Sequence, residues 1–212
     1  MPRKPLIRSD IFPYHVTNRT RDKIFYPLPL KEVWNIYTDQ LKIATWAFGA
    51  HIHAFVLMSN HYHLFLSTPE CNIDQIICFV QSEVSKKIFT KTNSKESYFE
   101  TRYRWSLIKD RNYFANVYRY IYQNPLRAGI VTRLEDYYFS SFHGKAGYSK
   151  LEIPLYNHFF YEDLNFNLHE EESWLNNVME EEQVKLVRKG IRRFEFSLST
   201  QDKLKFKPCT KR

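Results

Sequence analysis

One β-rich stretch, from Trp46 to Ser67, constrains the fold more than any other feature of the sequence. It is rich in β-branched, aromatic and other apolar residues, and it is interrupted at Ser59-Asn60, two residues that suit a tight turn. Two β-rich runs joined by so short a connection predict a β-hairpin. The rest of the fold must therefore be arranged around two neighbouring antiparallel strands.

The segments on either side of this hairpin alternate between extended and helical patterns. Apolar residues recur at helical spacing over 30–43 and 73–89, and β-forming residues fill 12–19 and 102–108. A further helix is predicted over 111–123, because Asp110 suits its N-cap and Pro125 requires it to stop. The order β-α-β-β-α-β-α predicts an α+β fold of the ferredoxin-like split βαβ class, with an antiparallel sheet, helices on one face and an added helix.

The distribution of charge divides the chain near residue 150. Residues 1–150 hold 21 basic and 12 acidic side chains, residues 151–182 hold nine acidic and no basic ones, and residues 183–212 hold ten basic and two acidic ones. We expect a main domain over 1–150 and an acidic, then basic, partly helical extension over 151–212. The end from 203 to 212 has the composition of a disordered arm, which either searches for phosphates or is a solvated tail without function.

Several classes of protein do not fit the composition. No run approaches the ~20 apolar residues of a membrane span, and the basic start lacks the apolar stretch of a secretory signal. The three cysteines form no CxxC pair, so neither a disulfide framework nor a thiolate zinc site is indicated. No Gly-rich phosphate loop is present among the five glycines. We therefore expect a cytoplasmic protein without membrane contacts, and its net charge of +8 favours a polyanionic partner.

Two histidines in the second half of the hairpin form a candidate metal pair. Alternate residues of a strand point to the same face, so His61 and His63 project together with their Cα atoms about 6.6 Å apart. Two imidazoles in this arrangement can share one divalent ion.

A second pair with the same spacing, His51 and His53, occupies the preceding strand. If Ser59-Asn60 is a two-residue turn, the register places His53 on the sheet face opposite to that of His61 and His63. A bulge or a three-residue loop would reverse this parity. Two other possible ligands, which no spacing argument selects, are His15 and His143.

The predicted helix over 111–123 carries a candidate nucleophile. Of its four tyrosines, Tyr120 lies about 40° and one turn away from Asn124, so both side chains can address the same point. The other three either point elsewhere or lie too far along the helix axis. The amide oxygen of Asn124 would complete a set of nitrogen and oxygen ligands that suits Mg²⁺ or Mn²⁺.

Three stretches of this sequence, taken in order, carry a family resemblance. They are His15-Val-Thr-Asn-Arg19, His53-Ala-Phe-Val-Leu-Met-Ser-Asn-His-Tyr-His-Leu64 and Tyr120-Ile-Tyr-Gln-Asn-Pro-Leu-Arg-Ala-Gly-Ile-Val131. Together they resemble the REP-associated tyrosine transposases, a branch of the single-tyrosine HUH transposases, over about residues 12 to 148. Ser59 stands where that family often has proline, which loosens the turn without removing any chemical group.

This resemblance implies both a fold and a site. The family has the split βαβ fold, its two metal-binding histidines match His61 and His63, and its nucleophile matches Tyr120. The family's polar residue four positions later matches Asn124. The catalytic domain would then be residues 1–150, and no family motif covers the extension.

The function expected from these features is that of a metal-dependent DNA transposase-like nuclease and strand transferase. It would cut and rejoin single-stranded, hairpin-containing DNA through a 5′-phosphotyrosine intermediate, using Mg²⁺ or Mn²⁺. The arginines expected to hold the DNA backbone are Arg19, Arg21, Arg102, Arg104 and Arg127. The aromatic residues available to stack on bases are Phe99, Tyr103 and Trp105.

Two other functions are compatible with the same residues. One is a metal-dependent hydrolase in which the histidine pair activates water, and the other is a domesticated protein that binds hairpin DNA without cutting it. A homodimer and a monomer are both open, as is the DNA target.

Overall fold

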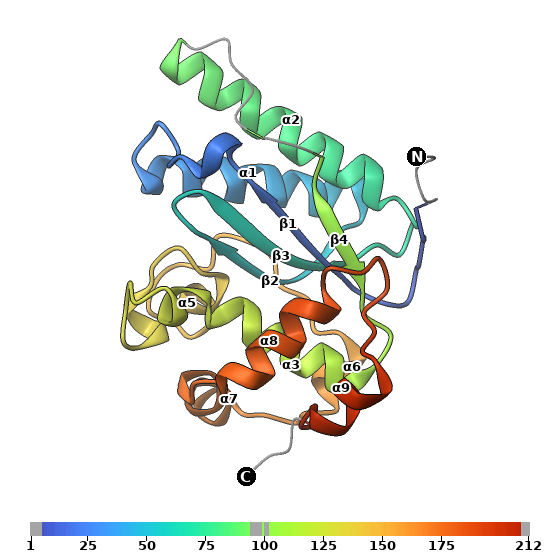
Figure 1. The fold of residues 1–212 in the computed structure, drawn as a ribbon. Helices are drawn as coiled ribbons and strands as arrows, with labels where there is room; N and C mark the ends of the chain where they lie inside the picture. Colours follow the sequence, from blue (N-terminus) through green and yellow to red (C-terminus); the bar gives the residue numbers. More distant parts are fainter. Residues whose placement is uncertain (1–5, 94–98, 100–101, 209–212) are drawn as a thin grey trace.

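The computed structural model describes residues 6–93, 99 and 102–208. Within this range the strands are β1 (Tyr14–Arg19), β2 (His51–Leu57), β3 (His61–Ser67) and β4 (Arg104–Leu107). They form an antiparallel sheet in the order β2-β3-β1-β4 (Figure 1). This is the order that a split βαβ unit produces, so the predicted α+β fold class is confirmed.

Two long helices, α1 (Leu30–Phe48) and α2 (Ile73–Thr92), pack side by side on one face of the sheet (Figure 1). Both follow the predicted apolar stripes, although α1 ends at Phe48, five residues beyond its predicted end. It stops there at its C-cap Gly49, which has a positive φ of 66°. The strand residues that face these helices include Tyr62, Leu64 and Leu66, and all three are buried in the first hydrophobic core. A 3-10 helix, η1 (Arg21–Lys23), connects β1 to this layer.

The helix α3 (Arg111–Tyr122) covers the opposite face of the sheet. It begins as predicted, because the Asp110 side chain accepts hydrogen bonds from the backbone nitrogens of Asn112 and Tyr113 at 2.8 and 3.0 Å. Its apolar side packs on the second core, where Phe65 meets Phe114 with ring centroids 4.9 Å apart. After one turn residue, Gln123, the chain forms the short helix α4 (Asn124–Arg127).

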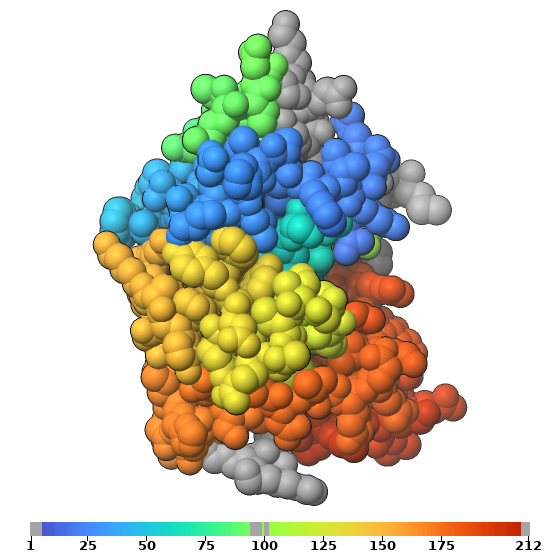
Figure 2. All heavy atoms as spheres, turned by 90° about the vertical axis from the view of Figure 1, so that its left-hand side faces the viewer, coloured from blue at the N-terminus to red at the C-terminus, as the bar shows by residue number. Residues whose placement is uncertain are grey.

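The extension after residue 150 packs against this second layer. Preceded by η2 (Leu134–Asp136) and α5 (Ser141–Lys145), it forms α6 (Phe159–Glu162), α7 (Leu168–Asn176), α8 (Glu181–Gly190) and α9 (Thr200–Lys205). The backbone nitrogen of Leu107 in β4 donates to the oxygen of Phe194 at 2.8 Å, and that of Phe196 donates back to the oxygen of Leu107 at 2.9 Å. Figure 2 shows the extension, in orange and red, packed against the yellow middle of the chain without a gap.

The first part of the polar segment 203–212 is also described and packs against the rest of the protein. Lys203 and Lys205 lie in α9, and the Phe206 ring packs edge-on against Tyr113 with centroids 5.2 Å apart. Residues 209–212 lie outside the described part of the chain. No helix among the described residues is both long enough and apolar enough to cross a membrane.

The hairpin has the predicted two-residue turn but also contains a bulge. The backbone nitrogen of Met58 donates to the oxygen of His61 at 2.8 Å, so Ser59-Asn60 closes the turn. The register then shifts between Ile52 and Ala54, and His53 is the extra residue. The expectation that His53 faces away from His63 was therefore wrong: its ring contacts Phe65 and Phe114 on the α3 side of the sheet.

Candidate active site

The two histidines of β3 and the predicted nucleophile of α3 meet between the sheet and the helix. The ring centroids of His61 and His63 are 5.2 Å apart, and those of His63 and Tyr120 are 5.7 Å apart with the rings nearly perpendicular. His63 and Tyr120 are buried, with 5% and 6% of their surface exposed, whereas His61 at the strand end is partly exposed. The fold thus brings Tyr120 to a histidine pair that lies nearly 60 residues earlier in the sequence.

In each histidine of this pair, the Nδ1 atom is hydrogen-bonded to another side chain of the protein. His61 Nδ1 lies 2.7 Å from the side-chain oxygen of Asn60, and His63 Nδ1 lies 2.9 Å from Nε2 of His15. Within the described residues, no hydrogen bond engages Nε2 of either ring. Because a metal-binding imidazole donates its second N–H to a fixed acceptor, this donor set fits a divalent ion held through the two Nε2 atoms.

His15, on β1, belongs to this cluster although no sequence pattern selects it. It is 1% exposed, its ring stacks on that of His63 at 5.2 Å, and it lies edge-on to Tyr120 at 6.5 Å. Strand β1 is the direct neighbour of β3 in the sheet, and His15 pairs with Phe65. His15 lies beside His63 because of the register between β1 and β3. The sequence of either strand alone does not reveal that register.

Burial keeps these imidazoles uncharged. It lowers the pKa of His15 to about 3 and that of His61 to about 4, and it lowers the pKa of His63 well below its usual value of 6.5. The guanidinium groups of Arg19 and Arg127 lower the pKa of His63 further. Neutral rings are the form that binds a metal ion.

Asn124 lies beside Tyr120 as predicted but is oriented by its own helix. Its Nδ2 atom donates to the backbone oxygens of Tyr120 and Ile121 at 3.1 and 3.0 Å, and its Oδ1 accepts from Arg127 Nη2 at 2.9 Å. A carbonyl oxygen has two lone pairs, so Oδ1 keeps one acceptor site for a metal ion. Among the described residues, no group of three or more His, Cys, Asp and Glu side chains is arranged to hold a metal.

Arg127, one of the predicted DNA-binding arginines, contacts the predicted nucleophile. Its guanidinium carbon lies 4.2 Å from the centre of the Tyr120 ring, and its Nη2 donates to the Tyr120 backbone oxygen at 3.0 Å. Burial lowers the pKa of Arg127 to about 10, so the group remains charged at neutral pH.

Two more of the predicted arginines share the sheet face of the histidines. Arg19 pairs directly with His61, and Arg104 pairs with Thr17, which in turn pairs with His63. Directly paired residues have their side chains on the same face, so both exposed arginines flank the cluster. The remaining two are exposed at positions outside the sheet, Arg21 in η1 and Arg102 before β4.

Other candidates from the sequence have structural partners. The ring nitrogens of His53 lie 2.7 Å from the Tyr156 oxygen and 2.7 Å from the Ser67 hydroxyl, and His143 Nδ1 lies 2.9 Å from the Ser149 hydroxyl. The three aromatic residues suggested for base stacking are half-buried against the first core: Phe99, Tyr103 and Trp105.

Comparisons with known proteins agree with this arrangement. The family model described as "Transposase IS200 like" matches residues 12–124, which include β1, the histidine pair, Tyr120 and Asn124. A Haemophilus influenzae protein named "Putative REP-associated tyrosine transposase" is 32% identical over 102 residues, which are 42% of this chain and 57% of that relative.

A solved structure has the same fold. It is described as "Structure of the REP associates tyrosine transposase bound to a REP hairpin" and superposes with a TM-score of 0.56 at 19% identity, covering 68% of this chain and 84% of that one. The family model spans more than half of the chain and ends at Asn124. The protein therefore belongs to the IS200-like transposase family.

Proposed function

We propose that this protein cuts and rejoins single-stranded, hairpin-containing DNA through a 5′-phosphotyrosine intermediate on Tyr120. The observation that carries the proposal is the contact of the Tyr120 ring with His63, on a face where two imidazoles keep Nε2 free of hydrogen bonds from the described residues. Family membership supports strand transfer, and the hairpin named for the solved relative supports the kind of DNA.

A divalent ion, Mg²⁺ or Mn²⁺, fits this site. Nε2 of His61, Nε2 of His63 and Oδ1 of Asn124 would hold it. When bound, such an ion polarises the scissile phosphate and stabilises the charge that develops on the departing 3′ oxygen.

In the proposed reaction the phenolic oxygen of Tyr120 forms a bond to phosphorus while the bond from phosphorus to the 3′ oxygen breaks. The phenol loses its proton and the departing oxygen gains one, so the products are a 5′-phosphotyrosine and a free 3′-OH. Arg127, which lies against the Tyr120 ring, would stabilise the negative charge that develops around the reacting phosphate. A second 3′-OH can reverse the step and join strands, because the phosphotyrosine is still a diester.

The proposed contacts to the DNA backbone follow the sheet edge and its flanks. Arg19 and Arg104 lie on the same face as the histidines, and Arg127 lies at the nucleophile. Arg21 and Arg102 extend this set at the ends of β1 and β4. Their role is electrostatic, so binding should weaken as salt rises.

The experiment is to incubate the protein with labelled single-stranded hairpin DNA and Mn²⁺ and to look for a covalent adduct on a denaturing gel. We expect an adduct with the wild-type protein and none with Tyr120→Phe. Tyr113→Phe is the matched control on the same helix and should form the adduct. If Tyr120→Phe still forms it, the nucleophile is wrong.

The two other functions give different results in the same assay. Cleaved ends without any adduct would indicate that water is the nucleophile, as in a metal-dependent hydrolase. Tight hairpin binding without cleavage would indicate a domesticated DNA-binding protein.

A further inference from the structure

The exposed edge of α8 carries two cations that have no acidic partner. Lys185 and Arg188 are one helical turn apart, both are exposed, and neither forms an ion pair within the described part of the chain. Three nearby lysines differ in this respect: Lys189 pairs with Asp202, Lys205 with Glu182 and Lys207 with Glu180. The pair Lys185 and Arg188 is called the α8 cationic edge below.

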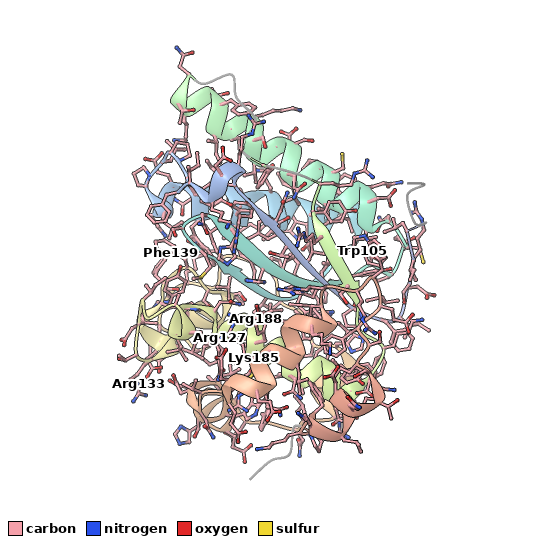
Figure 3. The ribbon with its side chains drawn as sticks, viewed as in Figure 1. Trp105, Arg127, Arg133, Phe139, Lys185 and Arg188 are labelled. Atoms are coloured by element: carbon pink, nitrogen blue, oxygen red, sulfur yellow. The ribbon has the colours of Figure 1, made fainter. Side chains whose placement is uncertain are left out.

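This edge lies beside the arginine that contacts the nucleophile. Arg188 lies near enough to Arg127 for their charges to interact, and α8 packs against α3, with Val184 and Val187 in the same core as Tyr120. In the view of Figure 3, Arg127, Lys185 and Arg188 are labelled in one region, beside α8 and below the sheet. None of these three cations forms an ion pair among the described residues, so their charge is available to an anion.

Arg127 itself has hydrogen-bonding capacity that the fold does not use. Its Nη2 is bonded to Asn124 and to the Tyr120 backbone, but its Nε and Nη1 atoms are buried without a partner. Unsatisfied buried donors are rare in folded proteins and call for an explanation. An anion drawn to this place by the α8 cationic edge would supply both the charge and the acceptors that are missing.

We propose that the α8 cationic edge, together with Arg127, is a phosphate-binding surface that holds the backbone of single-stranded DNA next to Tyr120. The inference rests on the proposed function and deepens it, because it assigns substrate binding to the extension. Lys185 and Arg188 lie more than 60 residues beyond the end of the family match at Asn124. Substrate affinity in this chain then depends on a segment that the shared family region does not contain.

The test is the salt dependence of binding to a labelled single-stranded DNA that contains a hairpin. The variant Lys185→Gln/Arg188→Gln removes two charges, and Lys42→Gln/Lys87→Gln removes two from α1 and α2 on the other face of the sheet. Losing two phosphate contacts should reduce the slope of log K against log salt by about 1.4 to 1.8. The control should keep the wild-type slope, and thermal unfolding should show both variants to be folded.

Two results would overturn the inference. One is a wild-type slope in Lys185→Gln/Arg188→Gln, and the other is an equal reduction in the control, which would indicate a general effect of net charge. Adduct formation by the wild-type protein, measured in parallel, separates this inference from the proposed function. A reduced slope without any adduct would reject the phosphotyrosine reaction and retain the binding surface, whereas an adduct with an unchanged slope would do the reverse.

Discussion

At the scale of single residues, the site depends on which nitrogen of each imidazole carries the proton. Asn60 Nδ2 donates to the backbone oxygen of Lys23 at 2.8 Å, which directs Asn60 Oδ1 toward His61 Nδ1. The turn residue therefore also fixes the tautomer of its neighbour. His15 fixes the tautomer of His63 in the same way, so two different segments of the chain orient the two histidines.

In the proposed metal site His15 would position His63, so its removal should weaken metal binding without unfolding the protein. We expect His15→Phe to keep the ring packing but to lose the acceptor for His63 Nδ1, and to lower Mn²⁺ affinity about 10- to 100-fold. Calorimetric titration with Mn²⁺ measures this directly. His15→Gln, which retains an acceptor, should recover part of the affinity, and His143→Phe should bind as the wild type does. Wild-type affinity in a folded His15→Phe variant would show that His15 only fills space.

His53 predicts an acid-dependent loss of stability. Burial lowers its pKa to about 3 in the folded protein, against 6.5 for the free group, so the unfolded state binds the extra proton below pH 6.5. The stabilisation is complete above that pH and decreases as the pH falls toward 3. Between pH 7 and pH 5 this residue alone should cost about 2 kcal/mol of unfolding free energy.

Urea unfolding at the two pH values checks this expectation. His53→Gln retains a donor for the Tyr156 oxygen and an acceptor for the Ser67 hydroxyl, and it should lose about 2 kcal/mol less than the wild type between pH 7 and pH 5. His169→Gln, on the exposed side of α7, is the control and should follow the wild type. An identical pH dependence in His53→Gln would mean that the buried ring does not titrate as described.

At the scale of helices and strands, the sheet and the helices α1, α2 and α3 follow from local sequence, and the departures from the predicted elements have local causes. Apolar periodicity gives α1 and α2 with C-terminal ends five and three residues short, whereas Asp110 and Pro125 give the bounds of α3. The bulge at His53 was not predictable from the alternation of residues, because both ring nitrogens find partners only after the chain has folded. Pro125 ends α3 as expected, yet the chain resumes a helical turn at once, since proline is tolerated in the first turn of a helix.

The candidate site divides in the same way. His61, His63 and Tyr120 are found from strand alternation, helix angle and motif, and the structure brings their rings together. The bond of His15 to His63 arises from the register between β1 and β3, which no pattern within one segment contains. The bond of Arg127 to Asn124 lies within α4, but it depends on side-chain conformations that residue spacing alone does not give.

The N-cap of α3 can be tested by itself. Asp110→Ala removes two side-chain hydrogen bonds to the first turn and should lower the unfolding free energy by about 1 kcal/mol. Asp110→Asn keeps the acceptor and should cost much less. Chemical denaturation of the two variants compares them, and equal losses would assign the effect to charge and not to capping.

At the scale of the whole molecule, the extension after residue 150 shares the second hydrophobic core with α3. Leu107 of β4 exchanges backbone hydrogen bonds with Phe194 and Phe196, and the Phe196 ring packs on Tyr113 of α3 with centroids 4.4 Å apart. Gly190, the last residue of α8, lies against the same ring, and an added Cβ would stand 2.3 Å from it. The charge boundary near residue 150 is thus crossed by a continuous set of apolar contacts.

Gly190→Ala should therefore destabilise the protein as a unit. We expect a loss of about 1 to 3 kcal/mol from overpacking against Phe196, with a single unfolding transition. Unfolding followed both by tryptophan fluorescence and by circular dichroism measures it. Phe196→Leu makes room, so Gly190→Ala/Phe196→Leu should lose less than the sum of the two single variants. Strict additivity would show that the two residues do not contact each other.

The most acidic part of the sequence supplies one carboxylate to the interior. Glu171 is 1% exposed; it accepts hydrogen bonds from Tyr118 and Tyr161 and pairs with Lys145 at 2.7 Å. A chain shortened at residue 150 would leave the Lys145 ammonium group and the Tyr118 hydroxyl without their acceptor, next to a newly exposed apolar surface. Inactivity of such a fragment would report damage to α3 and not a missing DNA contact, so the function of the extension has to be measured by substitution in the intact protein.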